Sequence, residues 1–225
     1  MCTDWRQEFV LLSDALDVSM LVEAINNRKP EGASESTVLG PFHVADAPEL
    51  PMKANIRLDE KGTPLRVHRR ILDTDGNPIS GAKIDVWQTN DDGFYDVQQT
   101  GIQPDFNLRG VLRTGDDGAY HFRGVKPNFY PISDDDPFKS CWRRLAAIRI
   151  GPHICITSSR PRAMTGLSPI SLNRTIPSSA WTRCLASSLM AKFQAVDDPA
   201  VALAAGLSGP FPNLAFDFVL SRVGQ

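Results

Sequence analysis

The stretch AKIDVWQTNDDGFYDV, residues 82–97, decides the fold. Apolar Ile84 and Val86 alternate with Lys83 and Asp85, which is the period of a strand with one buried face. A run of asparagine, aspartate and glycine then ends the strand and marks a turn. The stretch therefore predicts a β-strand, a turn and, directly after the turn, a phenylalanine followed by a tyrosine.

Similar units flank this stretch on both sides. PLRVHRRILDTDGNPI, residues 64–79, contains an Asp-Gly-Asn-Pro turn, and VLRTGDDGAYHFRGV, residues 111–125, contains an Asp-Asp-Gly turn. In the second unit Tyr120 and Phe122 alternate with polar neighbours. Short strands separated by turns at regular intervals are typical of an antiparallel β-sandwich.

The beginning of the chain has a helical pattern instead. Apolar residues recur at spacings of three and four between positions 9 and 20, which is the period of an amphipathic helix. From Pro30 onward, proline and glycine punctuate the sequence and favour extended chain and turns. We predict a helical segment over residues 1–29 and a mainly β sandwich over residues 30–225.

The composition argues against several classes of partner. The 225 residues carry 24 basic and 26 acidic side chains, for a net charge of -2, which gives no electrostatic basis for binding nucleic acid or an anionic membrane. No apolar run approaches the ~20 residues that span a bilayer, and no signal peptide is recognisable. The four cysteines show no paired spacing and are interpreted as free thiols. We expect a cytoplasmic protein.

Three stretches resemble the catalytic domain of intradiol ring-cleavage dioxygenases, and most closely the members that cleave hydroxyquinol. They are ESTVLGPFHVADAPELPM (residues 35–52), GNPISGAKIDVWQTNDDGFYDVQQ (76–99) and QPDFNLRGVLRTGDDGAYHFRGVKPNFYPI (103–132). The similarity runs almost without a break to about Pro137 and returns from about Ser188. It implies a β-sandwich enzyme that uses O2 to cleave hydroxyquinol, or alternatively catechol, between the two hydroxylated carbons, giving a (hydroxy)muconate or its tautomer maleylacetate.

Members of this family hold one ferric ion with two tyrosinates and two histidines. Phenolate is a hard anionic donor that favours Fe(III) over Fe(II). The resemblance implies that Tyr95, in GFYDV, stays bound to the metal. It also implies that Tyr130, in NFYPI, leaves the metal when the diol chelates and takes up a substrate proton. By itself, a tyrosine beside a turn is more often a half-buried packing residue.

Five further positions match residues that line the substrate pocket in this family: Leu11, Asp14, Val38, Leu39 and Gly40. Asp14 could accept a hydrogen bond from the third hydroxyl of hydroxyquinol, which would favour that substrate over catechol. The alternative interpretation makes Leu11 a helix core residue and Asp14 a solvated surface residue.

The family's two histidine ligands are missing. A signature resembling R-P-A-H-L-H is expected about twenty residues after Tyr130, by the resemblance, but only His153 lies near that place. The composition is anomalous in the same part of the chain. No aspartate or glutamate occurs between Asp136 and Asp197, a run of 60 residues in a chain that carries 26 acidic side chains.

The genetic code connects these two anomalies. Codons built from the third base of one residue and the first two bases of the next permit H-P-Y-R-P-A-H-L-H across residues 147–156. By the same rule SPISLNRTIPSSAWTRCLAS, residues 168–187, converts to THIFEPDDPFIGMDAVFGVK, which restores acidic residues. We infer that residues 139–187 are translated out of frame between two compensating indels. A divergent insert is the alternative, and it leaves the compliance of so many codons unexplained.

An out-of-frame segment predicts a damaged metal centre. Two tyrosinates without two imidazoles leave Fe(III) short of protein donors, so its affinity should fall. His153 remains a candidate ligand, although the alternative-frame histidine spans its codon and the nearness would then be a by-product. We expect residues 139–187 to be disordered or misfolded. The alternative function is an inactive pseudoenzyme that keeps only a β-sandwich binding or structural module.

Family members usually carry several helices ahead of the residues that match MCTDWRQEF. The resemblance therefore implies that residues 1–29 are the remnant of a helical linker domain. That domain forms a homodimer in the family, and its shortening would weaken the dimer and expose apolar helix faces.

Overall fold

The protein is described here by a computed structural model. It describes residues 2–3, 6–16, 18–34, 42–128, 130–131, 150–151, 154–159 and 193–221. The elements in chain order are β1 (Cys2–Thr3), β2 (Arg6–Gln7), α1 (Glu8–Ala15), α2 (Val18–Asn26), β3 (Pro64–Asp73), β4 (Lys83–Gln88), the 3-10 helix η1 (Asp96–Gln98), β5 (Arg109–Arg113), β6 (Ala119–Val125), β7 (Tyr130–Pro131), β8 (Ile150–Gly151), β9 (Ile154–Ser159), β10 (Gln194–Val196), α4 (Pro199–Ala204), β11 (Phe211–Ala215) and β12 (Phe218–Leu220).

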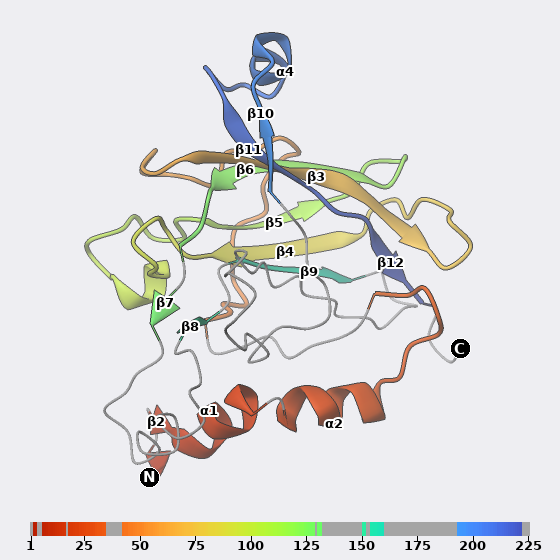
Figure 1. The fold of residues 1–225 in the computed structure, drawn as a ribbon, viewed down its shortest axis with the longest axis vertical. Coiled ribbons are helices and arrows are strands. Elements are labelled where there is room, and N and C mark those ends of the chain that lie inside the picture. The colour runs from red at the N-terminus through yellow and green to blue at the C-terminus, as the bar shows by residue number, and fades with distance from the viewer. Residues whose placement is uncertain are drawn as a thin grey trace.

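Two layers of strands form the body of the molecule (Figure 1). In one layer β10, β11, β3 and β12 follow one another, and β6 also pairs with β3. In the other layer β4 lies between β5 and β9. The sequence-based prediction of a mainly β sandwich is thus confirmed.

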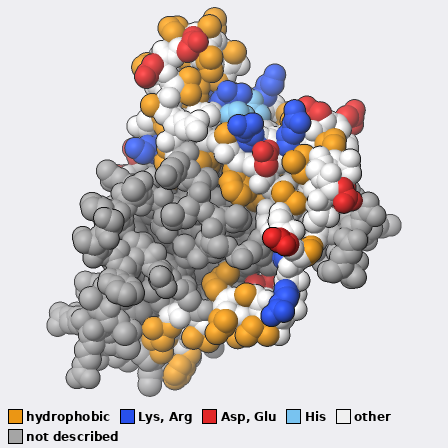
Figure 2. All heavy atoms as spheres, turned by 45° about the vertical axis from the view of Figure 1, so that its right-hand side comes forward, with side chains coloured by type: hydrophobic (Ala, Val, Ile, Leu, Met, Phe, Trp, Pro, Cys, Tyr) orange, Lys and Arg blue, Asp and Glu red, His pale blue; other side chains and the backbone are white. Residues whose placement is uncertain are grey.

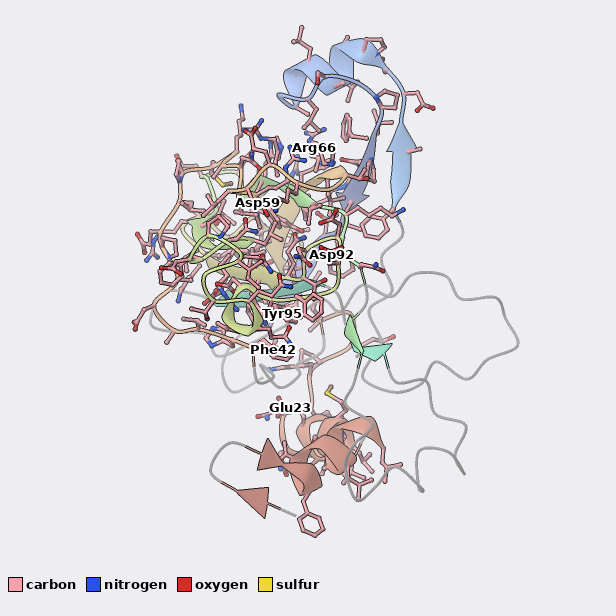
Figure 3. All side chains as sticks on the ribbon, turned by 90° about the vertical axis from the view of Figure 1, so that its left-hand side faces the viewer. Glu23, Phe42, Asp59, Arg66, Asp92 and Tyr95 are labelled. Atoms are coloured by element: carbon pink, nitrogen blue, oxygen red, sulfur yellow. The ribbon has the colours of Figure 1, made fainter. Side chains whose placement is uncertain are left out.

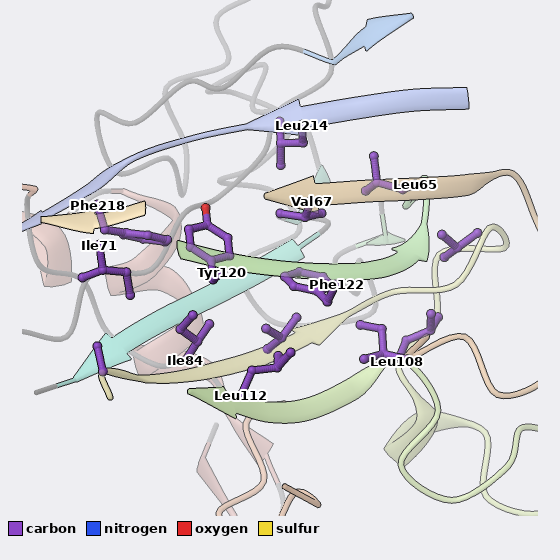
Figure 4. Packing of buried hydrophobic residues seen from close by; sticks show 14 of the residues in the cluster. Leu65, Val67, Ile71, Ile84, Leu108, Leu112, Tyr120, Phe122, Leu214 and Phe218 are labelled. Carbon is purple, nitrogen blue, oxygen red and sulfur yellow. The ribbon is translucent and has the colours of Figure 1, made fainter. Parts of the chain in front are cut away.

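The hydrophobic core fills the space between these layers (Figure 4). Ile84 and Val86 of β4 and Phe122 of β6 are each 0% exposed, and Tyr120 is 1% exposed. They point inward because successive strand residues face opposite sides of a sheet. Full burial of one large apolar side chain contributes about 1.5–3 kcal/mol. The alternation seen in the sequence therefore identifies the inner faces of β4 and β6.

Tyr120 also makes a polar contact at one end of this core. Its hydroxyl donates a hydrogen bond of 2.6 Å to the carbonyl of Phe216, in the short junction between β11 and β12. Burial raises the pKa of Tyr120 above its usual range, so the hydroxyl keeps its proton and remains a donor. This bond fastens β6 to a part of the chain 96 residues away.

The predicted turns are present and are held by their own polar side chains. Asp73 Oδ1 accepts hydrogen bonds from the backbone N–H groups of Asp75 and Asn77 at 3.0 and 2.8 Å. In the turn before β6, Gly118 has φ +70°, and an added Cβ would lie 2.7 Å from the carbonyl oxygen of Ile71. Glycine is required there because of both the backbone conformation and the lack of space.

One feature of the sheet differs from the antiparallel arrangement that we predicted. β11 and β12 both run parallel to β3, with Leu214 opposite Val67 and Val219 opposite Leu72. Parallel neighbours need a long crossover connection, and here the chain between β3 and β11 supplies it. Local turn signals carry no information about such a distant pairing.

Helices α1 and α2 lie within residues 1–29, together with the short strands β1 and β2, and the two helices lie apart from the sheets in Figure 1. Phe9, Leu21 and Ile25 are 58%, 60% and 63% exposed. None of the described helices combines the length and the apolar composition that crossing a membrane requires.

Two strands fall within residues 139–187, where we expected disorder or misfolding. β8 pairs with β7, and β9 pairs along the whole of β4, from Lys83 opposite Ser159 to Gln88 opposite Ile154. The rest of that segment lies outside the described residues.

Candidate active site

Tyr95 lies in a tightly hydrogen-bonded turn that follows β4. The side-chain oxygen of Asn90 accepts hydrogen bonds from the backbone N–H groups of Asp92 and Phe94 at 3.1 and 2.9 Å. The backbone N–H of Tyr95 in turn donates to Gln98 Oε1 at 2.9 Å. Asparagine, aspartate and glycine are the residues expected in such a turn, and here they fix the backbone that carries Tyr95.

The ring of Tyr95 is buried against a second aromatic side chain. Tyr95 is 1% exposed, and its ring stacks on that of Phe42 with centroids 4.5 Å apart. Figure 3 shows the two labelled residues close together at the end of the sandwich nearer the helices. Tyr95 is thus fully buried, whereas a tyrosine beside a turn is more often half-buried.

A buried ion pair anchors the residue that follows Tyr95. Arg109 Nε donates to Asp96 Oδ1 at 2.7 Å, and Arg109 Nη2 lies 2.6 Å from the same oxygen without hydrogen-bond alignment. The two side chains are 1% and 8% exposed. The pair joins η1 to the first residue of β5. Sequence reasoning missed it because residues 13 positions apart in an irregular segment carry no periodic signal.

A chain of amide side chains supports the same region from the other side. Asn107 Nδ2 donates to Gln103 Oε1 at 2.9 Å, and Gln103 Nε2 donates to Gln99 Oε1 at 2.9 Å. Asn107 Oδ1 accepts from the backbone N–H of Leu58 at 2.9 Å. These contacts hold residues 99–107 against the sandwich, so the segment after Tyr95 is fastened at several points.

The segment that carries Tyr130 pairs with β8, which shortly precedes β9 in the chain. Tyr130 of β7 pairs with Gly151 of β8, and β9 begins at Ile154, opposite Gln88 at the end of β4. The side chain of Tyr130 and the whole of His153 lie outside the described residues, so their predicted roles as metal ligands stay predictions.

The predicted roles of the five pocket residues also stay predictions. Leu11 and Asp14 belong to α1, but their side chains are not among the described ones. Val38, Leu39 and Gly40 lie outside the described residues. The next described residue in the chain is Phe42, which packs on Tyr95.

Comparison with known proteins decides the family. A family model described as Dioxygenase matches residues 38–221, and one described as Catechol dioxygenase N terminus matches residues 1–34. The chain belongs to the dioxygenase family. It is 52% identical over 231 aligned residues to a hydroxyquinol 1,2-dioxygenase of Rhizobium sp. (strain MTP-10005), which covers 99% of this chain and 76% of that protein.

Further relatives of this dioxygenase differ in their sequence identity and in the share of the chain that they cover. A 6-chlorohydroxyquinol 1,2-dioxygenase of Cupriavidus pinatubonensis is 49% identical over 137 residues, which covers 61% of this chain and 49% of that protein. Among solved structures, hydroxyquinol 1,2-dioxygenase from Pseudomonas putida DLL-E4 has a TM-score of 0.85 at 32% identity and covers 98% of this chain and 78% of that one. The resemblance seen in the sequence is therefore confirmed.

Non-haem iron is implied by the intradiol family, but the described side chains of this dioxygenase do not complete a site for it. No group of three or more histidine, cysteine, aspartate or glutamate side chains that could hold a metal occurs among the described residues. His43 Nε2 lies 3.2 Å from Asp85 Oδ2, and His68 and His121 face each other on the β3–β6 sheet. Tyr95 is thus the candidate iron donor among the described side chains.

Proposed function

We propose that this dioxygenase is an intradiol enzyme that cleaves hydroxyquinol with O2 between its two hydroxylated carbons. The single observation that carries the proposal is the 52% identity with a hydroxyquinol 1,2-dioxygenase over nearly the whole chain. The burial of Tyr95 on Phe42 supports a role for that phenol as an iron ligand. The relatives named above are all dioxygenases, so the pseudoenzyme alternative gains no support from them.

Tyr95 is proposed as the tyrosinate that stays on Fe(III), which would activate the bound diol for attack by O2. The contribution of the described residues is positional: Gln98, the Asp96–Arg109 pair and the Phe42 ring hold the phenol in one place. Such support matters because a catalytic group must be held in its productive geometry before the substrate binds. Tyr130 is proposed as the proton-accepting tyrosinate and His153 as a further candidate ligand.

We also propose that residues 139–187 are encoded out of frame. Several relatives support this, because they match the chain over only 134–138 residues, about 60% of its length. That is the length of the part that precedes the acid-free run. The expected metal ligands would return with the original frame.

Two forms of the protein test these proposals together. One is expressed as written, and the other carries the alternative-frame sequence over residues 139–187. We expect only the second to contain near-stoichiometric iron, to show the red-brown tyrosinate-to-iron band and to consume O2 with hydroxyquinol. Stoichiometric iron and turnover in the chain as written would refute the frame proposal. Loss of activity in both forms despite bound iron would refute the assigned reaction.

Two variants of the restored form identify the ligand. Tyr95→Phe should weaken and shift the visible band, because Tyr130 remains as the second proposed tyrosinate donor, whereas Tyr120→Phe, which removes another buried hydroxyl, should leave the band intact. The substrate is tested by comparing kcat/KM for hydroxyquinol and catechol before and after Asp14→Asn. A preference for hydroxyquinol that this change lowers at least about tenfold would support the Asp14 contact, and an unchanged preference would contradict it.

The exposed apolar residues of α1 and α2 support a homodimer of the family type. Analytical ultracentrifugation of the protein and of its Ile25→Glu variant, which places a charge on an exposed apolar position of α2, measures the association of two chains directly. A monomer at all concentrations before mutation would contradict it.

A further inference from the structure

The outer face of the β3–β6 sheet carries a cluster of basic side chains that ring cleavage does not use. We call Lys53, Arg66, His68, His121 and Arg123 the outer-face cluster. Arg66 lies directly opposite Arg123, and His68 lies directly opposite His121. Lys53 stands beside them, because its backbone N–H donates to the carbonyl of His121 at 2.8 Å. The cluster thus spans three adjacent chain segments.

The outer-face cluster lies away from the candidate active site. Figure 2 shows Lys, Arg and His side chains gathered together on the upper part of the molecule. In Figure 3, Arg66 and Tyr95 lie toward opposite sides of the sandwich. The cluster is therefore a separate feature from the site around Tyr95.

The positive charge of the cluster is not neutralised by neighbouring carboxylates. Among the described residues, no carboxylate oxygen lies within 4.0 Å of the charged ends of Arg66, Arg123 or Lys53. The charge of Asp217 acts on His68, and Asp217 Oδ1 accepts a hydrogen bond from the backbone N–H of Arg70 at 2.9 Å. Like charges placed directly opposite on neighbouring strands are destabilising, so the arrangement has a cost without a visible compensation.

Two polar atoms of the cluster also lack a hydrogen-bond partner. Arg66 Nε and His121 Nε2 are buried and have no partner among the described residues. Arg123 Nη1 donates to the carbonyl of Gly206 at 2.9 Å, which leaves the rest of its guanidinium available. Buried polar atoms are nearly always paired in proteins, so these two mark the place of a missing partner.

The lowered pKa values of the two histidines are consistent with an excess of positive charge in the outer-face cluster. Burial lowers the pKa of His121 to about 4, and the charges of Arg66, His68, Lys53 and Arg123 all act in the same direction. Burial also lowers the pKa of His68, and the charges of Arg66 and Arg69 act in the same direction, while a side-chain hydrogen bond with Asn213 and the charge of Asp217 oppose the shift. An anion at this position would oppose the part of these pKa shifts that comes from the basic neighbours, each of which contributes less than burial does.

We propose that the outer-face cluster binds a small tetrahedral oxyanion with two negative charges, either inorganic phosphate or the phosphoryl group of a monoester. Neighbouring strands lie ≈ 4.8 Å apart and alternate residues on one face are ≈ 6.8 Å apart, so the four side chains of β3 and β6 surround an area the size of one such group. Guanidinium groups bind phosphate oxygens with two parallel hydrogen bonds. An area of this size favours a compact anion over an extended acidic chain.

Calorimetric titration of the full chain with inorganic phosphate tests the proposal. We expect saturable binding with a Kd of roughly 1 mM or tighter. Arg66→Gln should weaken it about tenfold because one charge-assisted contact is lost. Arg113→Gln is the matched control, since Arg113 is an exposed arginine on β5 that pairs with Glu49. An absence of saturable binding, or equal weakening in both variants, would overturn the proposal.

Titration with sulfate tests the role of the two histidines separately, since sulfate remains a dianion between pH 5.5 and 7.5 and its own charge does not change. Its affinity should increase about threefold or more as the pH falls over that range, because the bound anion stabilises the protonated histidines. A pH-independent affinity for sulfate would contradict a role of His68 and His121.

The source of the anion is decided by parallel titrations with phosphate and with glycerol phosphate. Tighter binding of phosphate assigns the free ion, and tighter binding of glycerol phosphate assigns a monoester. Tighter binding of succinate than of both would overturn the tetrahedral assignment.

Discussion

Replacing Arg109 with methionine should destabilise the protein severely, because it leaves the Asp96 carboxylate buried without a partner. The two side chains are 1% and 8% exposed. Removing one member of a buried ion pair costs about 3–5 kcal/mol. Domains of this kind have a total stability of about 5–15 kcal/mol, so the loss is a large fraction of the whole.

The expected change in thermal stability follows from chain length. One kcal/mol shifts the midpoint of a domain of 150–250 residues by about 2–4 °C. Arg109→Met should therefore lower Tm by roughly 6–20 °C. The double variant Arg109→Met/Asp96→Asn should recover part of the loss, since the remaining buried group is then uncharged.

Urea unfolding followed by circular dichroism measures these differences. The control is Arg113→Met, at the last residue of the same strand, where Arg113 and Glu49 are 54% and 67% exposed. An exposed pair contributes only about 0–1 kcal/mol, so this variant should unfold at nearly the same urea concentration as the parent. Equal small losses at both positions would refute the reasoning, because the Arg109 pair would then behave as if it were solvated.

Three further measurements examine other parts of the fold. Tyr120→Phe should lower the free energy of unfolding by about 1–2 kcal/mol, since the carbonyl of Phe216 loses its donor; no loss in urea titration would contradict the contact. Gly118→Ala should cost more than about 1 kcal/mol, because its Cβ would meet the carbonyl of Ile71, and a neutral result would contradict the turn geometry. The pKa of His121 is lowered from 6.5 to about 4 in the folded state, so the unfolded chain binds the proton first and stability falls as the pH decreases from 6.5 to 4. Urea midpoints across that range should fall less steeply in His121→Gln, and identical slopes would refute this assignment.

The inner faces of the strands could be predicted from the sequence, but one exception shows the limit of alternation. Ile84 and Val86 are buried as predicted, yet Asp85 between them is only 6% exposed. Its carboxylate lies 3.2 Å from His43 and 3.6 Å from Lys83 Nζ. β4 is covered on its outer face by a segment some 40 residues earlier in the chain, and a local period cannot report such a cover.

In the candidate site, too, local features could be predicted from the sequence and contacts between distant segments could not. The turn residues predicted the position of Tyr95, because asparagine, aspartate and glycine act on their immediate neighbours. The partners that bury and anchor this region, Phe42 and the Asp96–Arg109 pair, come together only when distant segments fold. Tertiary contacts of this kind leave no trace in the pattern of apolar residues.

The parallel pairing of β11 and β12 with β3 affects how the protein folds during synthesis. β3 is made before the strands that pair with it in parallel, which are completed only at Leu220, so this sheet can finish assembling only after Leu220 has left the ribosome. The entropy of closing the intervening loop grows only with the logarithm of its length, about 0.6 kcal/mol for each doubling. The entropy of this closure therefore depends on the length of the connection before β10 and little on its residues, so a change of reading frame that keeps the length leaves this contribution to the folding free energy nearly unchanged.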